Sequence, residues 1–267
     1  PELTQVSSGR EALERLREGS YNLVITSPQV GDMNAAQLAD AVNAEDLGIP
    51  VVLLGYDALA LKDFVECNDC THIDRAFLWQ GDVRILLAIV KYVEDRMNLS
   101  RDTTEFGVQV IILIEDSVKY YSSYLPMIYA ELLRHSQSVI TEGINLSHKI
   151  LRMRARPKIL LCSSYEEAWR AFEDYSEDVL GVISDVEFPR EGELNRSAGI
   201  SFAKQVKKAY PDIPVLLQSS RPENEALAEK AEAAFVLKGS PTLLADLRRF
   251  MVDNFAFGEF IFRTPNG

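Results

Sequence analysis

The sequence has few cysteines, no excess of basic residues and no long apolar run, and each absence excludes a class of protein. Three cysteines among 267 residues do not make a disulfide framework, which fits a reducing compartment. A formal net charge of −12 argues against a general nucleic-acid or membrane-surface role, since both favour lysine and arginine. No run of about 18 or more apolar residues predicts a transmembrane helix, and the N-terminus lacks the regions of a signal peptide. We therefore expect a cytoplasmic protein.

Two of the cysteines have a spacing that could indicate metal or redox chemistry. Cys67 and Cys70 are separated by two residues, and His72 follows closely. A structural zinc site needs four ligands, and no second pair follows at a suitable distance. The pattern favours incidental cysteines over a metal or redox site.

Short apolar runs alternate with longer amphipathic segments along the chain. The apolar runs are rich in Val, Ile and Leu at consecutive positions, which is typical of parallel strands covered on both faces. The predicted strands cover residues 22–26, 51–54, 108–114, 158–162, 179–184, 215–218 and 235–237. The clearest helical patterns cover residues 9–18, 165–175, 199–209 and 242–250. Alternation of this kind predicts an α/β fold with doubly wound parallel sheets.

The two halves of the chain also resemble each other. YNLVITS at 21–27 parallels VLGVISD at 179–185, IPVVLL at 49–54 parallels IPVLLQ at 213–218, and AFLWQG at 76–81 parallels AFVLKG at 234–239. Matched blocks in one order predict two flavodoxin-like domains in tandem. We expect a first domain at 1–98, a linker at 99–107, a second domain at 108–253 and a C-terminal extension at 254–267 towards an absent output domain.

Acidic residues follow two predicted strands of the second half. Glu115 and Asp116 end its first strand, and Asp185 ends its third. In the flavodoxin-like order these strands are neighbours, and ligands bind beyond their carboxyl ends, so the three carboxylates should converge there. Clustered carboxylates repel each other unless a cation neutralises them, and hard oxygen ligands suit Mg²⁺.

Three further residues lie at the ends of the last two strands. Lys238 could pair with the oxygens of a phosphorylated Asp185, Ser219 offers a hydroxyl to the same oxygens, and Phe235 lies three residues before the lysine. Taken singly, the acidic pair and Ser219 could be helix caps, and Lys238 a solvated surface residue. Their joint order at successive strand ends favours a site.

With these residues in place, residues 108–252 resemble the receiver domain of two-component response regulators. The acidic pair, the acceptor Asp185, Pro189 four residues later, the switch pair Ser219 and Phe235, and Lys238 all match that family's pattern. The resemblance implies Mg²⁺ held by Glu115 or Asp116, by Asp185 and by the backbone carbonyl of Glu187. It also implies a histidine kinase or phosphotransfer protein as donor, and a regulatory domain rather than an enzyme.

Two departures from that pattern affect the expected structure. The long segment 117–157 has room for a first helix at 117–134, kinked or begun by Pro126, and a second helical segment near 141–153. Residues 191–197 lengthen the loop after Asp185, and could restrict access to it or present a specific surface.

The first half keeps the pattern of the fold but not the acidic residues. Ser27 stands at the position of Asp185, Gly55 at that of Ser219 and Gln80 at that of Lys238. The chain begins at what looks like the second strand, so the first strand and its acidic pair are absent from this sequence. The first half therefore resembles a degenerate receiver domain. Its expected role is structural, or else dimerisation, partner docking or inhibition of the second half.

Finer features resemble the receiver region ahead of phosphoenolpyruvate-synthase-like kinases, which implies an enzyme partner in the same polypeptide. The basic run at 149–158 reads as a solvated helix face or as a docking surface. Two rival functions remain: an interaction module in which neither half is phosphorylated, and a Mg²⁺-dependent phosphatase with an aspartate nucleophile.

Overall fold

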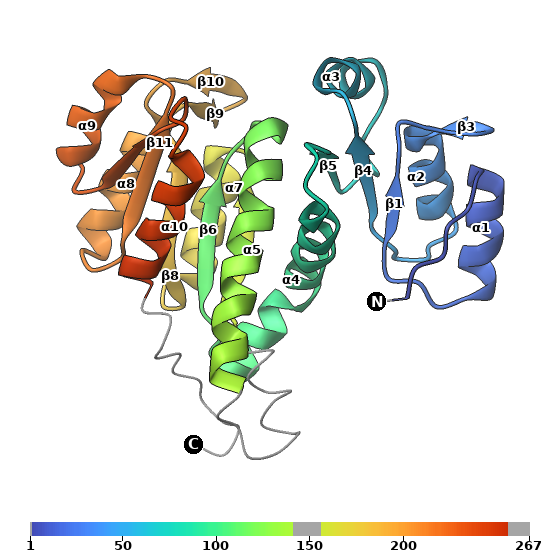
Figure 1. Ribbon diagram of the computed structural model, residues 1–267, viewed down its shortest axis with the longest axis horizontal. Coiled ribbons are helices and arrows are strands. Elements are labelled where there is room, and N and C mark those ends of the chain that lie inside the picture. The colour runs from blue at the N-terminus through green and yellow to red at the C-terminus, as the bar shows by residue number, and fades with distance from the viewer. Residues whose placement is uncertain (1, 141–155, 256–267) are drawn as a thin grey trace. The chain divides into compact units, whose positions relative to one another are not determined.

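The structure is a computed structural model that describes residues 2–140 and 156–255 (Figure 1). The chain divides into two compact units, Pro1–Val93 and Glu94–Gly267. The expected helical segment at 141–153, most of the basic run at 149–158 and most of the extension at 254–267 lie outside the described residues. No helix in the described ranges is long and apolar enough to span a membrane.

The first unit contains a small parallel sheet of three strands in the order β1-β4-β5, with a separate hairpin of β2 and β3. Its elements are α1 (Gly9–Glu18), β1 (Val24–Thr26), β2 (Gln29–Val30), β3 (Met33–Asn34), α2 (Ala35–Ala44), β4 (Val51–Gly55), α3 (Ala58–Cys67) and β5 (Arg75–Leu78). Leu13 and Leu16 of α1 pack against Leu38 and Val42 of α2 in its core. The sequence predicts that the chain begins at the second strand of a five-stranded flavodoxin-like sheet, but residues 2–8 form no strand. Among the described residues, this sheet therefore contains counterparts of the third, fourth and fifth strands only.

A single helix crosses the boundary between the units. Helix α4 (Arg84–Phe106) includes most of the stretch 99–107 that the sequence predicts to be a linker. That segment is helical because its apolar residues continue a buried face: Leu99 belongs to the core of the second unit. The division between the units falls earlier, between Val93 and Glu94.

The second unit is a five-stranded parallel sheet in the order β12-β11-β8-β6-β7. Counted along the unit, this is the second-first-third-fourth-fifth order of flavodoxin-like folds, and it confirms the predicted fold. The elements after α4 are β6 (Val110–Ile114), α5 (Val118–Ile140), β7 (Lys158–Cys162), α7 (Tyr165–Tyr175), β8 (Val179–Asp185), β9 (Phe188–Arg190), β10 (Glu193–Asn195), α8 (Ala198–Ala209), β11 (Val215–Ser219), the 3₁₀ turn η1 (Pro222–Asn224), α9 (Glu225–Glu229), β12 (Ala234–Leu237) and α10 (Leu243–Asn254).

Helices cover both faces of this sheet. Helices α5 and α10 lie together on one face, and α7 and α8 lie on the other (Figure 1). Every residue of β6 and of β11 is buried. Because helices cover both faces of the sheet, successive side chains of these strands are all buried, which explains their consecutive apolar residues.

The C-terminal half of α4 is joined to the second unit by a buried network of charges. Asp95 is fully buried, and its carboxylate oxygens lie 2.6 and 3.1 Å from the Arg156 guanidinium. The same carboxylate accepts hydrogen bonds from the Tyr129 hydroxyl of α5 at 2.9 Å and from the Ile159 backbone N–H of β7 at 3.0 Å. Burial opposes the charge of Arg156, but Asp95 raises its pKa overall. Three chain segments thus meet at one carboxylate: α4, α5 and the segment from Arg156 into β7.

Two local expectations change in the structure. The helix expected at 117–134 extends to Ile140, and Pro126 lies inside it, which is one of the two positions expected for this proline. The loop expected at 191–197 is largely an ordered hairpin, in which β9 and β10 turn at Glu191 and Gly192, both with positive φ. The first unit has the corresponding hairpin, β2 and β3, after Ser27.

Candidate functional site

The carboxyl ends of β6, β8 and β12 bring acidic and basic side chains together. Carboxylate oxygens of Glu115, Asp116 and Asp185 all lie within 4.8 Å of one another. Lys238 follows β12 directly, and its ammonium contacts two of the three carboxylates. The structure thus places these four residues together, as the strand order predicts, while their roles stay predictions.

Asp185 has distinct partners at its two carboxylate oxygens. Oδ1 accepts hydrogen bonds from the backbone N–H groups of Val186 at 2.6 Å and Glu187 at 3.3 Å. Oδ2 lies 2.5 Å from the Lys238 ammonium. The residue is only 7% exposed. Oδ1 is therefore held by the backbone, and Oδ2 is paired with the Lys238 ammonium at the end of a flexible side chain.

Lys238 is buried and lies between two carboxylates. Its Nζ is 2.7 Å from Glu115 Oε2 and 4.3 Å from the centre of the Tyr120 ring. Burial alone would lower the pKa of Lys238, but the charges of Glu115 and Asp185 raise it overall. The lysine therefore stays positively charged in this site.

Glu115 is fully buried and closely held. Its Oε2 accepts hydrogen bonds from Lys238 and, at 3.2 Å, from the Gln218 amide, and its Oε1 accepts one at 3.1 Å from the Ser117 N–H. Burial raises the pKa of Glu115 to about 8, with a further contribution from Asp185 and opposition from Lys238. The Glu115 carboxyl group is therefore close to its own titration near neutral pH.

The donor set of the cluster fits a hard divalent cation. Burial and the charge of Asp185 also raise the pKa of the exposed Asp116. Three carboxylates face one ammonium group, so the cluster has surplus negative charge that a proton or a cation would neutralise. Carboxylate oxygens with access to water are the ligands that Mg²⁺ and Mn²⁺ prefer.

Cys67, Cys70 and His72, the other candidate metal ligands, do not form a comparable group. Among the described residues, Glu115, Asp116 and Asp185 are the one set of three or more candidate metal ligands that converge. His72 Nδ1 instead lies 2.8 Å from Asp40 of α2. Burial raises the pKa of the Cys70 thiol, so a smaller fraction of this side chain is in the reactive thiolate form.

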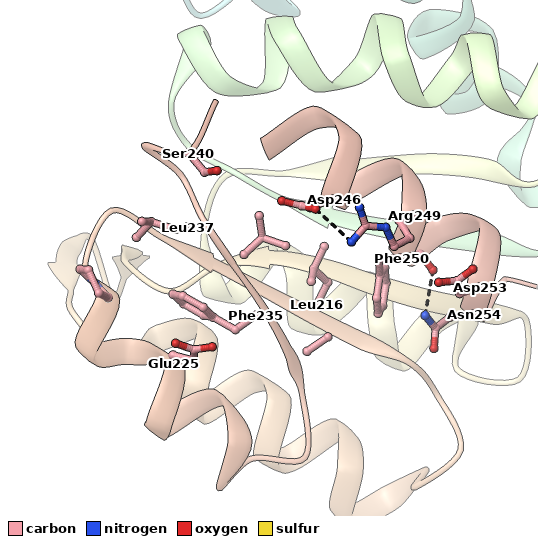
Figure 2. Close-up of a pocket in the computed structure, with 13 residues that line it drawn as sticks. Leu216, Glu225, Phe235, Leu237, Ser240, Asp246, Arg249, Phe250, Asp253 and Asn254 are labelled. Atoms are coloured by element: carbon pink, nitrogen blue, oxygen red, sulfur yellow. Dashed lines mark hydrogen bonds and ion pairs between the residues drawn. The ribbon is translucent and has the colours of Figure 1, made fainter. Parts of the chain in front are cut away.

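The two predicted switch residues lie near the site without touching its carboxylates. Ser219 Oγ accepts hydrogen bonds from the Arg221 N–H at 3.1 Å and the Asn224 amide at 2.9 Å, so it supports the turn before α9. Phe235 is half-buried in a surface pocket between β12, α9 and α10 (Figure 2). Figure 2 shows its ring near Glu225, at the start of α9.

Glu187 has contacts on both its backbone and its side chain. Its N–H donates to Asp185, and its carboxylate lies 3.0 Å from the Arg221 guanidinium. The predicted metal contact through its backbone carbonyl stays a prediction.

Sequence reasoning missed three residues of the site. Gln218 contacts Glu115, and the Tyr120 ring contacts Lys238. Tyr124 is fully buried one helical turn after Tyr120. Burial, followed by the charge of Glu115, raises the pKa of the Tyr124 hydroxyl. Two signals were available in the sequence. Gln218 is a polar residue inside an otherwise apolar strand, and the two tyrosines follow the acidic pair by one and two helical turns.

The first unit has different residues at the corresponding strand ends. Strands β1 and β4 pair as β8 and β11 do, which places Ser27 at the position of Asp185 and Gly55 at that of Ser219. Ser27 Oγ donates a hydrogen bond to the Gln29 carbonyl at 2.6 Å. No carboxylate stands at these two positions.

The expected equivalence of Gln80 with Lys238 is wrong. The Trp79 backbone N–H donates to the Gly55 carbonyl at 2.8 Å, as the Lys238 N–H donates to the Ser219 carbonyl at 2.8 Å. The register of β4 with β5, compared with that of β11 with β12, gives the same equivalence. Trp79 therefore occupies the position of the lysine, because strand β5 is shifted by one residue relative to the gap-free match of the two sequences.

Comparisons with known proteins return receiver domains among solved structures. A response regulator receiver domain protein from Clostridium thermocellum matches with 18% identity and a TM-score of 0.39, over 56% of this chain and 95% of its own. The Mn²⁺-bound form of response regulator Rcp1 matches with 16% identity and a TM-score of 0.32, over 58% of this chain and 99% of its own. No family model and no curated protein sequence matches the chain. The fold assignment rests on the strand order of the second unit itself.

Proposed function

We propose that the second unit is a receiver domain whose Asp185 accepts a phosphoryl group in a Mg²⁺-dependent reaction. One observation carries the proposal: Asp185 lies at the carboxyl end of the central strand, with Glu115 and Asp116 within 4.8 Å and the Lys238 ammonium at 2.5 Å. This arrangement combines a nucleophile with the positive charge and the candidate metal ligands that phosphoryl transfer requires.

The proposed step is an in-line displacement at phosphorus. Asp185 Oδ2 attacks the phosphorus of a phosphohistidine, the P–N bond breaks, and the imidazole leaves with the bonding electrons and takes up a proton. An acyl phosphate forms on Asp185. Its Oδ1 keeps the hydrogen bonds from Val186 and Glu187, which hold the carboxylate in place during the attack.

Lys238 can serve the same step from its present position. Its ammonium would turn from the Asp185 carboxylate to the oxygens of the incoming phosphoryl group and offset their charge. Glu115, Asp116 and Asp185, with the backbone carbonyl of Glu187, would hold the cation. A bound Mg²⁺ supplies further neutralisation of the transferring group.

The output is proposed to run through strands β11 and β12. A phosphoryl group on Asp185 offers oxygens to the Ser219 hydroxyl, which would give up its bonds to Arg221 and Asn224. Phe235 would then turn from its pocket. The donor is proposed to be a histidine kinase or phosphotransfer protein in the cytoplasm, and the recipient an output domain or a phosphoenolpyruvate-synthase-like enzyme.

The first unit is proposed to be a receiver-like domain that is not phosphorylated. Ser27 and Trp79 replace the acceptor and the lysine, so the carboxylate chemistry of the second unit has no counterpart there. Tyr56, 68% exposed, lies next to Trp79 with ring centres 6.4 Å apart. An aromatic surface thus stands where the second unit has its charges, which suits docking better than catalysis.

The direct test is incubation with acetyl phosphate and Mg²⁺, followed by intact-mass measurement. The wild-type chain should gain about 80 Da, one phosphoryl group in place of a proton, and lose it on treatment with hydroxylamine. Ser27→Ala should gain the same mass, because its hydroxyl lies in the first unit. A wild-type chain that gains no mass and binds neither Mg²⁺ nor beryllofluoride would contradict the proposal.

Cation affinity should depend on pH, because protons and Mg²⁺ compete for the same carboxylates. With the pKa of Glu115 raised to about 8, its ionised fraction increases roughly tenfold per pH unit well below that value and approaches its maximum above it. The apparent affinity for Mg²⁺ should rise by up to about tenfold per pH unit below pH 8 and level off above it. Calorimetric titrations at three pH values across this range measure the effect. An affinity that is independent of pH across this range would contradict the prediction that protons compete with Mg²⁺ for Glu115.

One observation favours an interaction module that is never phosphorylated. Lys238 already contacts both Glu115 and Asp185, so the cluster can act as a structural ion-pair network. Such a module would bind its partner equally well with and without acetyl phosphate. The phosphatase alternative has less support. Such enzymes usually have an acid/base aspartate two residues after the nucleophile, and here that residue is Glu187, whose carboxylate pairs with Arg221.

A further inference from the structure

Gln218 lies beside the proposed acceptor but has no place in the chemistry described above. It is 1% exposed, near the end of β11, and pairs in register with Asp185 of β8. Its Nε2 donates a hydrogen bond of 3.2 Å to Oε2 of Glu115, which directly follows β6, two strands away from β11 in the sheet. Its Oε1 is buried and has no hydrogen-bond partner among the described residues.

This amide is costly in its position. A buried carbonyl oxygen without a partner destabilises a fold, because it has lost its hydrogen bonds to water and gained none in the protein. An apolar side chain in the same place would avoid that cost. The amide is therefore explained by what its donor end does rather than by packing.

The first unit shows the apolar alternative. Because β1 and β4 pair as β8 and β11 do, Leu54 of β4 occupies the position of Gln218. Leu54 is buried in a strand of the same length. The unit without the acidic cluster has leucine at this position, and the unit with the cluster has glutamine.

The contacts of Glu115 indicate what the amide does. Lys238 and Gln218 donate to the same oxygen, Oε2. When a cation or a phosphoryl group draws the ammonium away, the Gln218 amide and the Ser117 N–H still hold the Glu115 carboxylate. Hydrogen-bond donors behind a ligating carboxylate commonly change metal affinity by about 10–100-fold when they are removed.

We propose that Gln218 is a positioning residue that holds the Glu115 carboxylate beside Asp116 and Asp185 for a divalent cation. The inference rests on the cation site of the proposed function. It assigns to Gln218 the affinity of that site for Mg²⁺ and no part in the transfer of the phosphoryl group itself.

The test compares Gln218→Leu, the residue of the first unit, and Gln218→Met, which is closer in shape, with the wild-type chain. Calorimetric titration with MgCl₂ should show about tenfold weaker binding in both variants. In assays with acetyl phosphate, the Mg²⁺ concentration for half-maximal phosphorylation should rise by the same factor, while the rate at saturating Mg²⁺ stays within about twofold. Gln205→Leu on α8 is the matched control: it removes a hydrogen bond of 3.0 Å from the Tyr165 hydroxyl but no contact of Glu115, so its Mg²⁺ affinity should equal that of the wild-type chain.

The outcomes separate the inference from the proposed function. Unchanged Mg²⁺ affinity in both Gln218 variants, with normal binding by the wild-type chain, would overturn the role of Gln218 alone. A lower rate at saturating Mg²⁺ with unchanged affinity would also overturn it, since that result assigns Gln218 to the transfer step or to the fold. A wild-type chain that binds no Mg²⁺ would overturn the cation site and the inference together.

Discussion

Asp185→Asn should abolish phosphoryl uptake under conditions that label the wild-type chain completely. An amide oxygen is a poor nucleophile, and the substitution also removes the negative charge that faces Lys238 at 2.5 Å. The fold should survive, because asparagine has the same shape and Glu115 still pairs with Lys238 at 2.7 Å. Intact mass after incubation with acetyl phosphate and Mg²⁺ should show no gain of about 80 Da.

The matched control for this prediction is Asp174→Asn, the same chemical change on the exposed surface of α7. It should be labelled as fully as the wild-type chain. If Asp185→Asn were still labelled, the acceptor would be another residue. Asp116, the more exposed member of the acidic pair, would be the first to examine by peptide mapping.

Asp95→Ala should lower the free energy of unfolding of the second unit by about 3–5 kcal/mol. The substitution leaves the Arg156 guanidinium, only 1% exposed, without its closest carboxylate, and removes the acceptor of the Tyr129 and Ile159 hydrogen bonds. Urea unfolding followed by Trp169 fluorescence measures the effect, in a Trp79→Phe background so that the signal reports the second unit alone.

The control for Asp95 is Glu105→Ala on the same helix. Glu105 forms an exposed pair with Arg101 at 3.0 Å, and such a pair contributes less than about 1 kcal/mol. A loss for Asp95→Ala as small as that for Glu105→Ala would show that the buried network does not attach α4 to the second unit.

The strands and the acidic cluster could be predicted because burial on both faces leaves a clear signal. Residues 158–162 form a strand with the predicted ends, and helices 9–18 and 165–175 also match. Ser8 and Ser164 cap these two helices in the same way. Once the strand order is known, the positions of Glu115 and Asp185 follow from it.

Features that depend on register or on long-range contacts could not be predicted. A one-residue shift of β5 leaves the sequence match of the two halves intact, so that match pairs Gln80 with Lys238, where the strand register places Trp79. The α4 stretch from 99 to 106 looks like a linker because its polar residues are many. Its burial depends on Lys158, which lies far along the chain and whose ammonium is 2.7 Å from the Asp102 carboxylate.

The hairpins β2–β3 and β9–β10 bear on the order of events in the history of this chain. Each unit has such a hairpin between its sheet strand and the next helix. If the two units descend from one duplicated gene segment, the hairpin was present before the copies diverged. The charged residues at the strand ends differ between the copies, so their divergence came later. The hairpin is then an ancestral trait, retained in the copy that has serine where the other has Asp185.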